Sequence, residues 1–160
     1  MPRKIFKKIS PPKEKIENLP FFYKIKDEYK KNIFSLRKFA VAKAFFFGLF
    51  FAFIPMPFQM VVVLFTSILF KHNLPISILL VWITNPFTMP FIFGLEYYLG
   101  AILLNHELLI FSMNLLENSI DNIFIDLYFG AIIISSIFSS IGYFIVINYW
   151  KWKLKRKKKI

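Results

Sequence analysis

The sequence predicts an all-α integral membrane protein, built as a small bundle with proline-interrupted helices and an N-terminal amphipathic helix. Three observations predict this class. Of the 160 residues, 57% are hydrophobic and 19% are charged, which is more apolar surface than a soluble core of this size absorbs. No Lys or Arg occurs from residue 72 to residue 150. Two long apolar tracts, 39–70 and 74–104, are interrupted by prolines.

The distribution of charge predicts the topology. Twelve basic residues precede Phe39 and seven lie in segment 151–159, with only Lys43 and Lys71 between these groups. The acidic residues of the second half all lie between the basic ends, namely Glu96, Glu107, Glu117, Asp121 and Asp126. Because basic flanks of membrane spans stay on the cytoplasmic side, both termini and the Lys71 turn are expected in the cytoplasm. The protein is therefore predicted to be multi-pass, with an even number of full crossings.

Residues 1–38 are predicted to be a basic tail followed by an interfacial helix. Segment 1–19 is basic and contains Pro11 and Pro12, which indicates a mobile tail. Over 21–38, apolar residues recur every three or four positions between lysines, a pattern typical of an amphipathic helix in the inner headgroup region. The alternative is a solvated helix packed on the rest of the protein.

Segment 39–150 is predicted to be the membrane domain, and its first part, 39–70, a broken helical hairpin. The apolar runs on either side of Pro55 and Pro57 are each shorter than the about 20 residues that span a bilayer. Proline lacks a backbone N–H and clashes with the preceding turn, so the helix must kink or end there. The pattern fits a re-entrant hairpin and a fully crossing hairpin equally.

The second part, 74–104, is predicted to be a helix interrupted between Thr84 and Pro90. Asn85 stands before Pro86, and Thr88 stands two residues before Pro90. Asn and Thr are preferred helix caps, and proline is favoured in the first helical turn. The chain is therefore expected to unwind between Thr84 and Pro90 and then to resume as a helix through Leu104.

The remainder of the chain is predicted to return to the cytoplasm. An acidic outer segment, 105–126, is followed by the most continuous apolar run, 127–149, which predicts a transmembrane helix. Trp150 and the basic cytoplasmic tail 151–160 are typical of an anchor at the inner interface.

The two interruptions are the strongest indication of a binding site in the sequence. A helix that ends inside a bilayer directs unpaired N–H groups and the positive end of its dipole into the interior, where anionic groups are favoured. The candidate ligand-binding residues are Pro55, Pro57, Gln59, Thr84, Asn85, Pro86 and Thr88. They predict a site for a small anionic or lipid-linked ligand. The alternative is a scaffold in which Asn85 and Gln59 only cap helices.

The sequence indicates no catalytic residue, no metal and no cofactor. The chain has no Cys, and His72 and His106 stand alone, without partners at metal-binding spacing. Glu96 is flanked by apolar residues, and its distance from Asn73 along a helix places it near the outer interface. Membrane lipid is the expected partner of the C-terminal lysines, and no nucleic acid is expected.

A row of small residues marks the last predicted helix. Ala131, Ser135 and Ser139 lie four positions apart. Small residues at this spacing let helices approach closely. The row is expected to pack within the chain or between chains, and it predicts the contact of a homo-oligomer.

Short motifs between Arg37 and Leu104 resemble those of a known family. They are Gly48-Leu49-Phe50, Pro55-Met56-Pro57, Gln59-Met60, Asn73-Leu74-Pro75, Trp82, Asn85-Pro86, Thr88-Met89-Pro90 and Gly100. Together they resemble the bacterial membrane family called domain of unknown function 2062. One departure is Phe58, because members often carry Gly after the second proline or nearby.

The resemblance implies a place in the bacterial inner membrane. Some members look fused to glycosyltransferase domains, which implies work near lipid-linked sugars. The expected function is a non-enzymatic membrane factor that binds or moves a small anionic or lipid-linked ligand at the broken helices. The alternative is a structural or adaptor protein that supports an envelope enzyme of the glycosyltransferase type.

Overall fold

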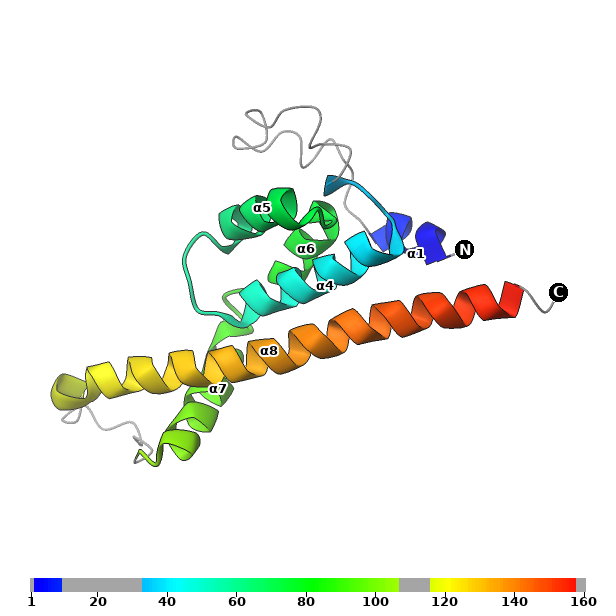
Figure 1. Ribbon diagram of the computed structural model, residues 1–160. Helices are drawn as coiled ribbons and strands as arrows, with labels where there is room; N and C mark the ends of the chain where they lie inside the picture. Colours follow the sequence, from blue (N-terminus) through cyan, green and yellow to red (C-terminus); the bar gives the residue numbers. More distant parts are fainter. Residues whose placement is uncertain (1, 10–32, 107–115, 158–160) are drawn as a thin grey trace.

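The computed structural model describes residues 2–9, 33–106 and 116–157, whose regular structure is six helices without a strand (Figure 1). The helices are α1 (Pro2–Ile9), α4 (Lys38–Phe53), α5 (Gln59–Phe70), α6 (Leu74–Val81), α7 (Met89–Leu104) and α8 (Leu116–Lys157). The prediction of an all-α protein is thereby confirmed. Most of the predicted amphipathic helix, 21–38, lies outside the described residues.

Helix α4 packs antiparallel along the C-terminal half of α8 (Figure 1). The ring of Phe53 at the end of α4 lies 5.2 Å from the ring of Phe138, centroid to centroid. Towards the other end, a Cβ added to Gly142 would lie 2.6 Å from Cδ1 of Leu49. The two helices therefore approach closely at Gly142, where the flexible end of the Leu49 side chain would have to move to admit a Cβ.

Helix α6 runs parallel to α4 and is tied to it by hydrogen bonds in a nearly constant register. The bonds run from Asn73 N to Ala40 O (3.1 Å), from Ser77 Oγ to Ala44 O (3.1 Å) and from Thr84 Oγ1 to Ala52 O (2.8 Å). Helix α5 connects them along the chain and packs on both, and Lys43 Nζ donates to Phe70 O at 3.3 Å. The α4–α5–α6 unit is therefore held by backbone carbonyls of α4 and α5 as well as by apolar contacts.

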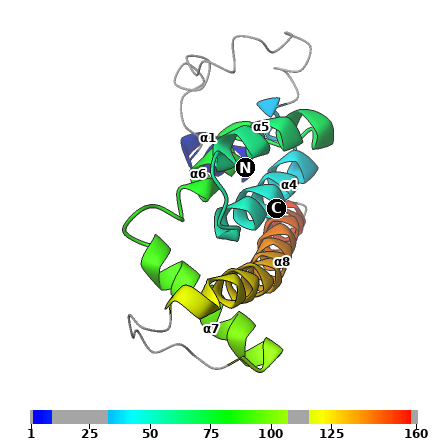
Figure 2. The same ribbon diagram turned by 90° about the vertical axis from the view of Figure 1, so that its left-hand side faces the viewer.

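Helix α7 crosses α8 steeply, towards the N-terminal end of α8 (Figures 1 and 2). A Cβ on Gly100 would lie 1.8 Å from the carbonyl oxygen of Asp126, and a Cβ on Gly130 would lie 1.8 Å from that of Glu96. Such distances are far inside van der Waals contact, so both positions require glycine. The two backbones touch at this crossing.

Two apolar clusters form the core of the described residues. The first joins α1, α4, α6 and the end of α8 through Phe6, Val41, Ala42, Ala44, Ile76, Val146, Ile147 and Trp150. The second joins α5 and α6 through Ile33, Val63, Leu64, Leu74 and Val81. Helix α7 contributes to neither cluster, so its crossing with α8 is its main attachment.

Residues 2–9 differ from the mobile tail that the sequence predicted, because they form helix α1. Phe6 is only 7% exposed and stacks on Trp150 with ring centroids 5.6 Å apart. Pro11 and Pro12 follow the helix and do not interrupt it. Composition indicated mobility, but one buried aromatic side chain, a tertiary contact, fixes the segment.

Helix α8 is longer at both ends than the transmembrane helix predicted over 127–149. It takes in the last part of the predicted acidic outer segment and the start of the basic tail, while 107–115 lies outside the described residues. No proline follows Pro90 in the chain. Polar and charged residues limit which part of a helix can lie in lipid, but without a proline they do not by themselves end the helix.

The small residues Ala131, Ser135 and Ser139 are all fully buried within the chain. In this arrangement the row packs internally. The predicted contact between two copies stays a prediction.

One helix within the described residues, Asp121–Arg156, is long and apolar enough to cross a membrane. The mean hydropathy of its most apolar 18-residue window is 2.1. Helices α5 and α7 are apolar but shorter.

Candidate functional site

The two helix-free stretches, 54–58 and 82–88, lie next to each other and line one cleft of about 480 Å³. The lining residues are Met56, Pro57, Phe58, Gln59, Met60, Val61, Val81, Trp82, Thr84, Asn85, Pro86 and Met89. Five of the seven candidate residues therefore lie together around one hollow. The other two, Pro55 and Thr88, belong to the same stretches but do not line it.

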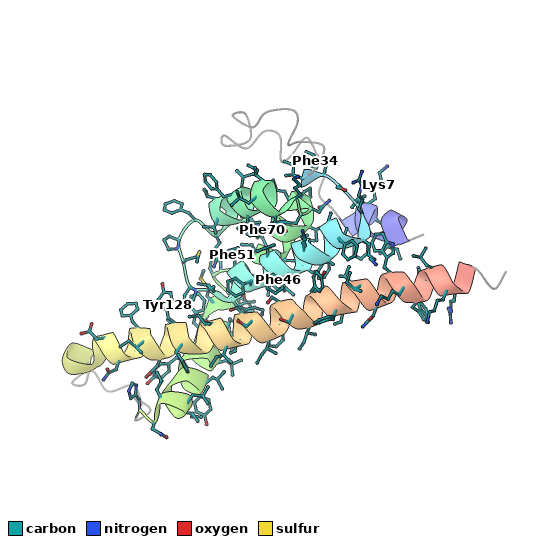
Figure 3. All side chains as sticks on the ribbon, in the orientation of Figure 1. Lys7, Phe34, Phe46, Phe51, Phe70 and Tyr128 are labelled. Carbon is teal, nitrogen blue, oxygen red and sulfur yellow. The ribbon has the colours of Figure 1, made fainter. Side chains whose placement is uncertain are left out.

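The first stretch turns the chain from α4 into α5. Met56 N and Gln59 Nε2 both donate to the carbonyl oxygen of Ile54, at 2.8 Å and 2.9 Å. The carbonyl oxygen of Pro55 accepts a 2.6 Å hydrogen bond from the hydroxyl of Tyr128 (Figure 3). The amide nitrogen of Gln59, a candidate ligand contact, is thus bound to its own turn.

Phe58 closes this stretch in an unusual conformation. Its φ of 60° lies in the left-handed region, which favours glycine because a Cβ crowds the backbone there. Helix α5 starts after it without a side-chain cap, and the carbonyl oxygen of Phe58 accepts from Val61 N at 2.8 Å.

Asn85 and Thr88 hold the second stretch together. Oδ1 of Asn85 accepts from the backbone N–H groups of Phe87 (2.9 Å) and Thr88 (3.1 Å). Oγ1 of Thr88 donates to Ile83 O at 2.6 Å and accepts from Asn85 N at 3.0 Å. The expectation that Thr88 caps the following helix is wrong, since its side chain makes no cap bond and turns back along the chain.

Thr84 fixes the second stretch to α4. Its hydroxyl donates to Ala52 O at 2.8 Å and the residue is 7% exposed. Ala52 lies in the last turn of α4, where carbonyl groups lack partners within the helix. The polar side chains of the cleft thus bond to backbone.

The walls of the cleft are apolar, and its lining contains no charged side chain. Three of the five methionines of the chain, Met56, Met60 and Met89, stand there beside Trp82. Methionine is flexible and polarisable, and it recurs at binding surfaces that adapt to their ligand. Sequence reasoning selected the prolines and polar residues and missed these walls. The methionines near both interruptions were the signal that could have found them.

Glu96 is fully buried at the crossing of α7 and α8, and neither of its carboxylate oxygens has a hydrogen-bond partner. Nearby on the same crossing, Asp126 Oδ1 lies 2.7 Å from Nδ1 of His106. No group of three or more His, Cys, Asp or Glu side chains in the described ranges is arranged to hold a metal.

His72 and Ser77 form a second buried polar group. Nδ1 of His72 lies 2.9 Å from Oγ of Ser77, and Nε2 lies 3.3 Å from Oγ1 of Thr66. Both His72 and Ser77 are fully buried. Burial lowers the pKa of His72 to about 4, so its imidazole is neutral at pH 7. A serine and a histidine with no access to substrate are structural, and they lock the turn before α6.

Over residues 2–9, 33–106 and 116–157 the regular structure is all helical, and one helix is long and apolar enough to cross a membrane. A cleft lies between two proline-containing stretches. Residues 28–159 match the family described as an uncharacterised protein conserved in bacteria, the domain of unknown function 2062. The chain belongs to this family, as its motifs implied. Helix α1 lies outside the matched residues. No curated protein and no solved structure matches the chain.

Proposed function

We propose that the protein is embedded in the bacterial inner membrane as a multi-pass protein and binds the apolar part of a lipid-linked ligand in the cleft. The observation that carries the proposal is the contrast inside the cleft. Its walls are apolar, while the side chains of Gln59, Thr84 and Asn85 are bound to backbone.

The surface of α8 supports the membrane setting. Segment 127–150 contains no charged residue, and at about 1.5 Å per residue it exceeds the about 30 Å of a bilayer core. Large apolar side chains are exposed along it: Phe129, Ile132, Ile137, Phe138, Ile141, Phe144 and Ile145. An exposed apolar surface this long is costly in water and favourable in lipid.

The placement of the chain ends supports the proposed topology. Helix α1 and the basic end of α8 lie at the same end of the molecule (Figures 1 and 2). The bond from Lys43 to the end of α5 brings the Lys71 turn close to the start of α4. Both observations agree with cytoplasmic termini and a cytoplasmic turn at Lys71.

The ligand class follows from the chemistry of the walls. A small free anion would need charged or unpaired donors, and the polar side chains of the cleft already bond to the backbone. A hydrocarbon chain would instead bury apolar surface against Met56, Met60 and Met89. The cleft therefore favours a lipid-linked ligand over a small anion.

Photo-crosslinking in proteoliposomes tests the proposal. A phospholipid with a diazirine in its acyl chain is incorporated, and labelled residues are mapped by mass spectrometry. We expect labels concentrated at the three cleft methionines. Met89→Trp should fill the cleft and reduce this labelling about tenfold, whereas Leu103→Trp on the exposed face of α7 should not change it.

Two results would contradict the proposal. One is even labelling along the exposed face of α8 with no excess at the cleft. The other is equal cleft labelling in the wild type and in Met89→Trp, because a filled cleft cannot take a chain.

The internal bonding of Asn85 and Thr88 also favours a second function, that of a rigid structural or adaptor protein. Side chains committed to the backbone stiffen a surface without binding a ligand. In that case one envelope protein should co-purify in stoichiometric amount, and Met89→Trp should leave its capture unchanged. Asn85→Ala should reduce both protein level and capture.

A further inference from the structure

We propose that helix α1 and the neighbouring ends of α4 and α8 form one binding surface for the phosphate headgroups of anionic phospholipids. This surface, called here the basic collar, consists of Lys7, Lys8, Arg37, Lys38, Lys151, Lys153, Lys155 and Arg156. It shares only the membrane setting with the proposed function, because the cleft lies at the opposite end of α4.

Phe6 is the contact that assembles the collar. Its ring stacks on Trp150 at an interplanar angle of 9° and meets Phe45 and Tyr149 edge-on, with centroids 6.2 Å and 6.3 Å away. An isolated helix of eight residues is not stable in water, so α1 depends on this docking. Docked in this way, α1 places Lys7 at the end where α4 begins and α8 finishes (Figure 3). Lys8 follows in the same last turn of α1.

The cations of the collar are not neutralised within the described residues. None of them lies within ion-pair distance of a carboxylate there. The acidic side chains described, Glu96, Asp121 and Asp126, lie on α7 and on the N-terminal part of α8. Asp126 and Lys151 are about 38 Å apart along the helix at 1.5 Å per residue. Among the described residues, the collar is therefore strongly electropositive and lies far from the acidic side chains.

Aromatic rings stand between the cations. The guanidinium of Arg156 lies 4.1 Å from the ring centroid of Trp152, and Nζ of Lys38 lies 4.4 Å from that of Phe39. Trp152 is 48% exposed and Phe39 is 56% exposed. Cations next to exposed rings fit a partner that offers anionic and apolar groups side by side, as the headgroup region of a bilayer does.

The position of the collar selects lipid over nucleic acid. It begins at the residue where the uncharged segment 127–150 ends. When that segment lies in the bilayer, the collar lies at the level of the lipid phosphates. Lysines close to an anionic leaflet strengthen binding by about fivefold each.

Lipid retention measures the collar directly. The full chain is reconstituted in nanodiscs of phosphatidylcholine with a minor fraction of phosphatidylglycerol, and the lipids that remain bound are counted by native mass spectrometry. We expect wild-type protein to enrich phosphatidylglycerol. Lys7→Gln with Lys8→Gln should lower this enrichment about tenfold or more. Lys7→Arg with Lys8→Arg should retain it, because the charges remain.

Phe6→Ala tests the docked geometry with every charge in place. Once circular dichroism shows that the remaining helices are intact, we expect the same loss of phosphatidylglycerol as for the double glutamine variant. Unchanged enrichment in Phe6→Ala would show that the charges act without the docked helix, and no enrichment in the wild type would overturn the proposal altogether. Displacement of the lipid by single-stranded RNA at equal phosphate concentration would mark a nucleic-acid surface instead. Labelling of the cleft should be unchanged by these variants, so the two proposals fail separately.

Discussion

The hydroxyl of Tyr128 donates a 2.6 Å hydrogen bond to the carbonyl oxygen of Pro55, across 73 residues of sequence. The donor stands on α8 and the acceptor stands in the stretch between α4 and α5, beside the cleft. A carbonyl that leaves a helix next to proline has no partner in its own segment. Tyr128 supplies that partner, and in doing so it joins the long helix to the edge of the candidate site.

Removal of this one hydroxyl should loosen the first stretch. We expect Tyr128→Phe to lower the free energy of unfolding by about 1 kcal/mol, the usual contribution of such a bond. Thermal unfolding in detergent, followed by circular dichroism, measures it. Tyr98→Phe is the matched control, because Tyr98 is 51% exposed on α7 and its hydroxyl has no such bond in the described structure. Equal midpoints of thermal unfolding for the two variants would show that the Tyr128 hydroxyl does not stabilise the first stretch.

The crossing of α7 and α8 should not tolerate a methyl group. Gly100→Ala places a Cβ against the carbonyl oxygen of Asp126, and the helices must separate to admit it. We expect a loss of about 3 kcal/mol or more, measured by the same unfolding assay. Gly94→Ala is the control on the same helix, since nothing lies within 4 Å of the added Cβ. That change should be neutral or raise stability by up to about 1 kcal/mol through helix propensity.

Phe58 holds a left-handed conformation in a position that is 79% exposed. Phe58→Gly should relieve the crowding of its Cβ and raise the free energy of unfolding by about 1 kcal/mol. Phe65→Gly, at an exposed position inside α5, should do the opposite because glycine weakens a helix interior. A destabilised Phe58→Gly would mean that the ring has contacts in lipid that offset the strain.

His72 should make the protein sensitive to acid. The pKa of its imidazole is lowered by burial from 6.5 to about 4, so below pH 6.5 the unfolded chain takes up a proton that the folded chain excludes. Stability contributed by the neutral ring is complete above pH 6.5 and is lost progressively as the pH falls to 4, by about 3 kcal/mol in all. Chemical unfolding at a series of pH values measures this slope. His72→Gln should flatten it.

Glu96 should be a source of instability. Its carboxylate oxygens are buried without a hydrogen-bond partner, and such a group loses its interaction with water and gains nothing in return. We expect Glu96→Met to raise the free energy of unfolding by about 1–3 kcal/mol. Asp121→Asn, which removes an exposed charge from α8, should have little effect. Instability of the methionine variant would show that Glu96 has a partner outside the described residues.

The cleft shows how far sequence reasoning reaches. It selected the two stretches from their prolines and from the polar side chains of Gln59, Thr84 and Asn85. It did not reveal that α4 and α6 are parallel, and this arrangement is what brings the stretches together. It also left open whether the polar side chains bind a ligand or only cap helices. Their bonds to backbone carbonyls depend on distances that no local pattern records.

The helix ends show the same division. The predicted tract 74–104 begins at the same residue as α6, and Asn73 Oδ1 caps that helix by accepting from Ile76 N at 3.1 Å. The sequence did not predict that α8 extends beyond its apolar part, because charge and hydropathy indicate the surroundings of a helix and not where it ends. The sequence did not predict the docking of α1 through Phe6 either, since a single aromatic residue in a basic segment forms no hydrophobic periodicity.

The sequence by itself determined the all-α class, the family, the apolar character of the long helix and the separation of basic ends from acidic middle. These properties depend on residue types and their spacing along the chain, so they can be predicted without knowing which residues are in contact. Only the tertiary structure decided that Gly100 and Gly130 carry the α7–α8 crossing, that α1 docks on Trp150, and that methionines wall the cleft. The reason is physical: these features depend on which surfaces meet, and close packing between distant segments is set by three-dimensional fit and not by local pattern.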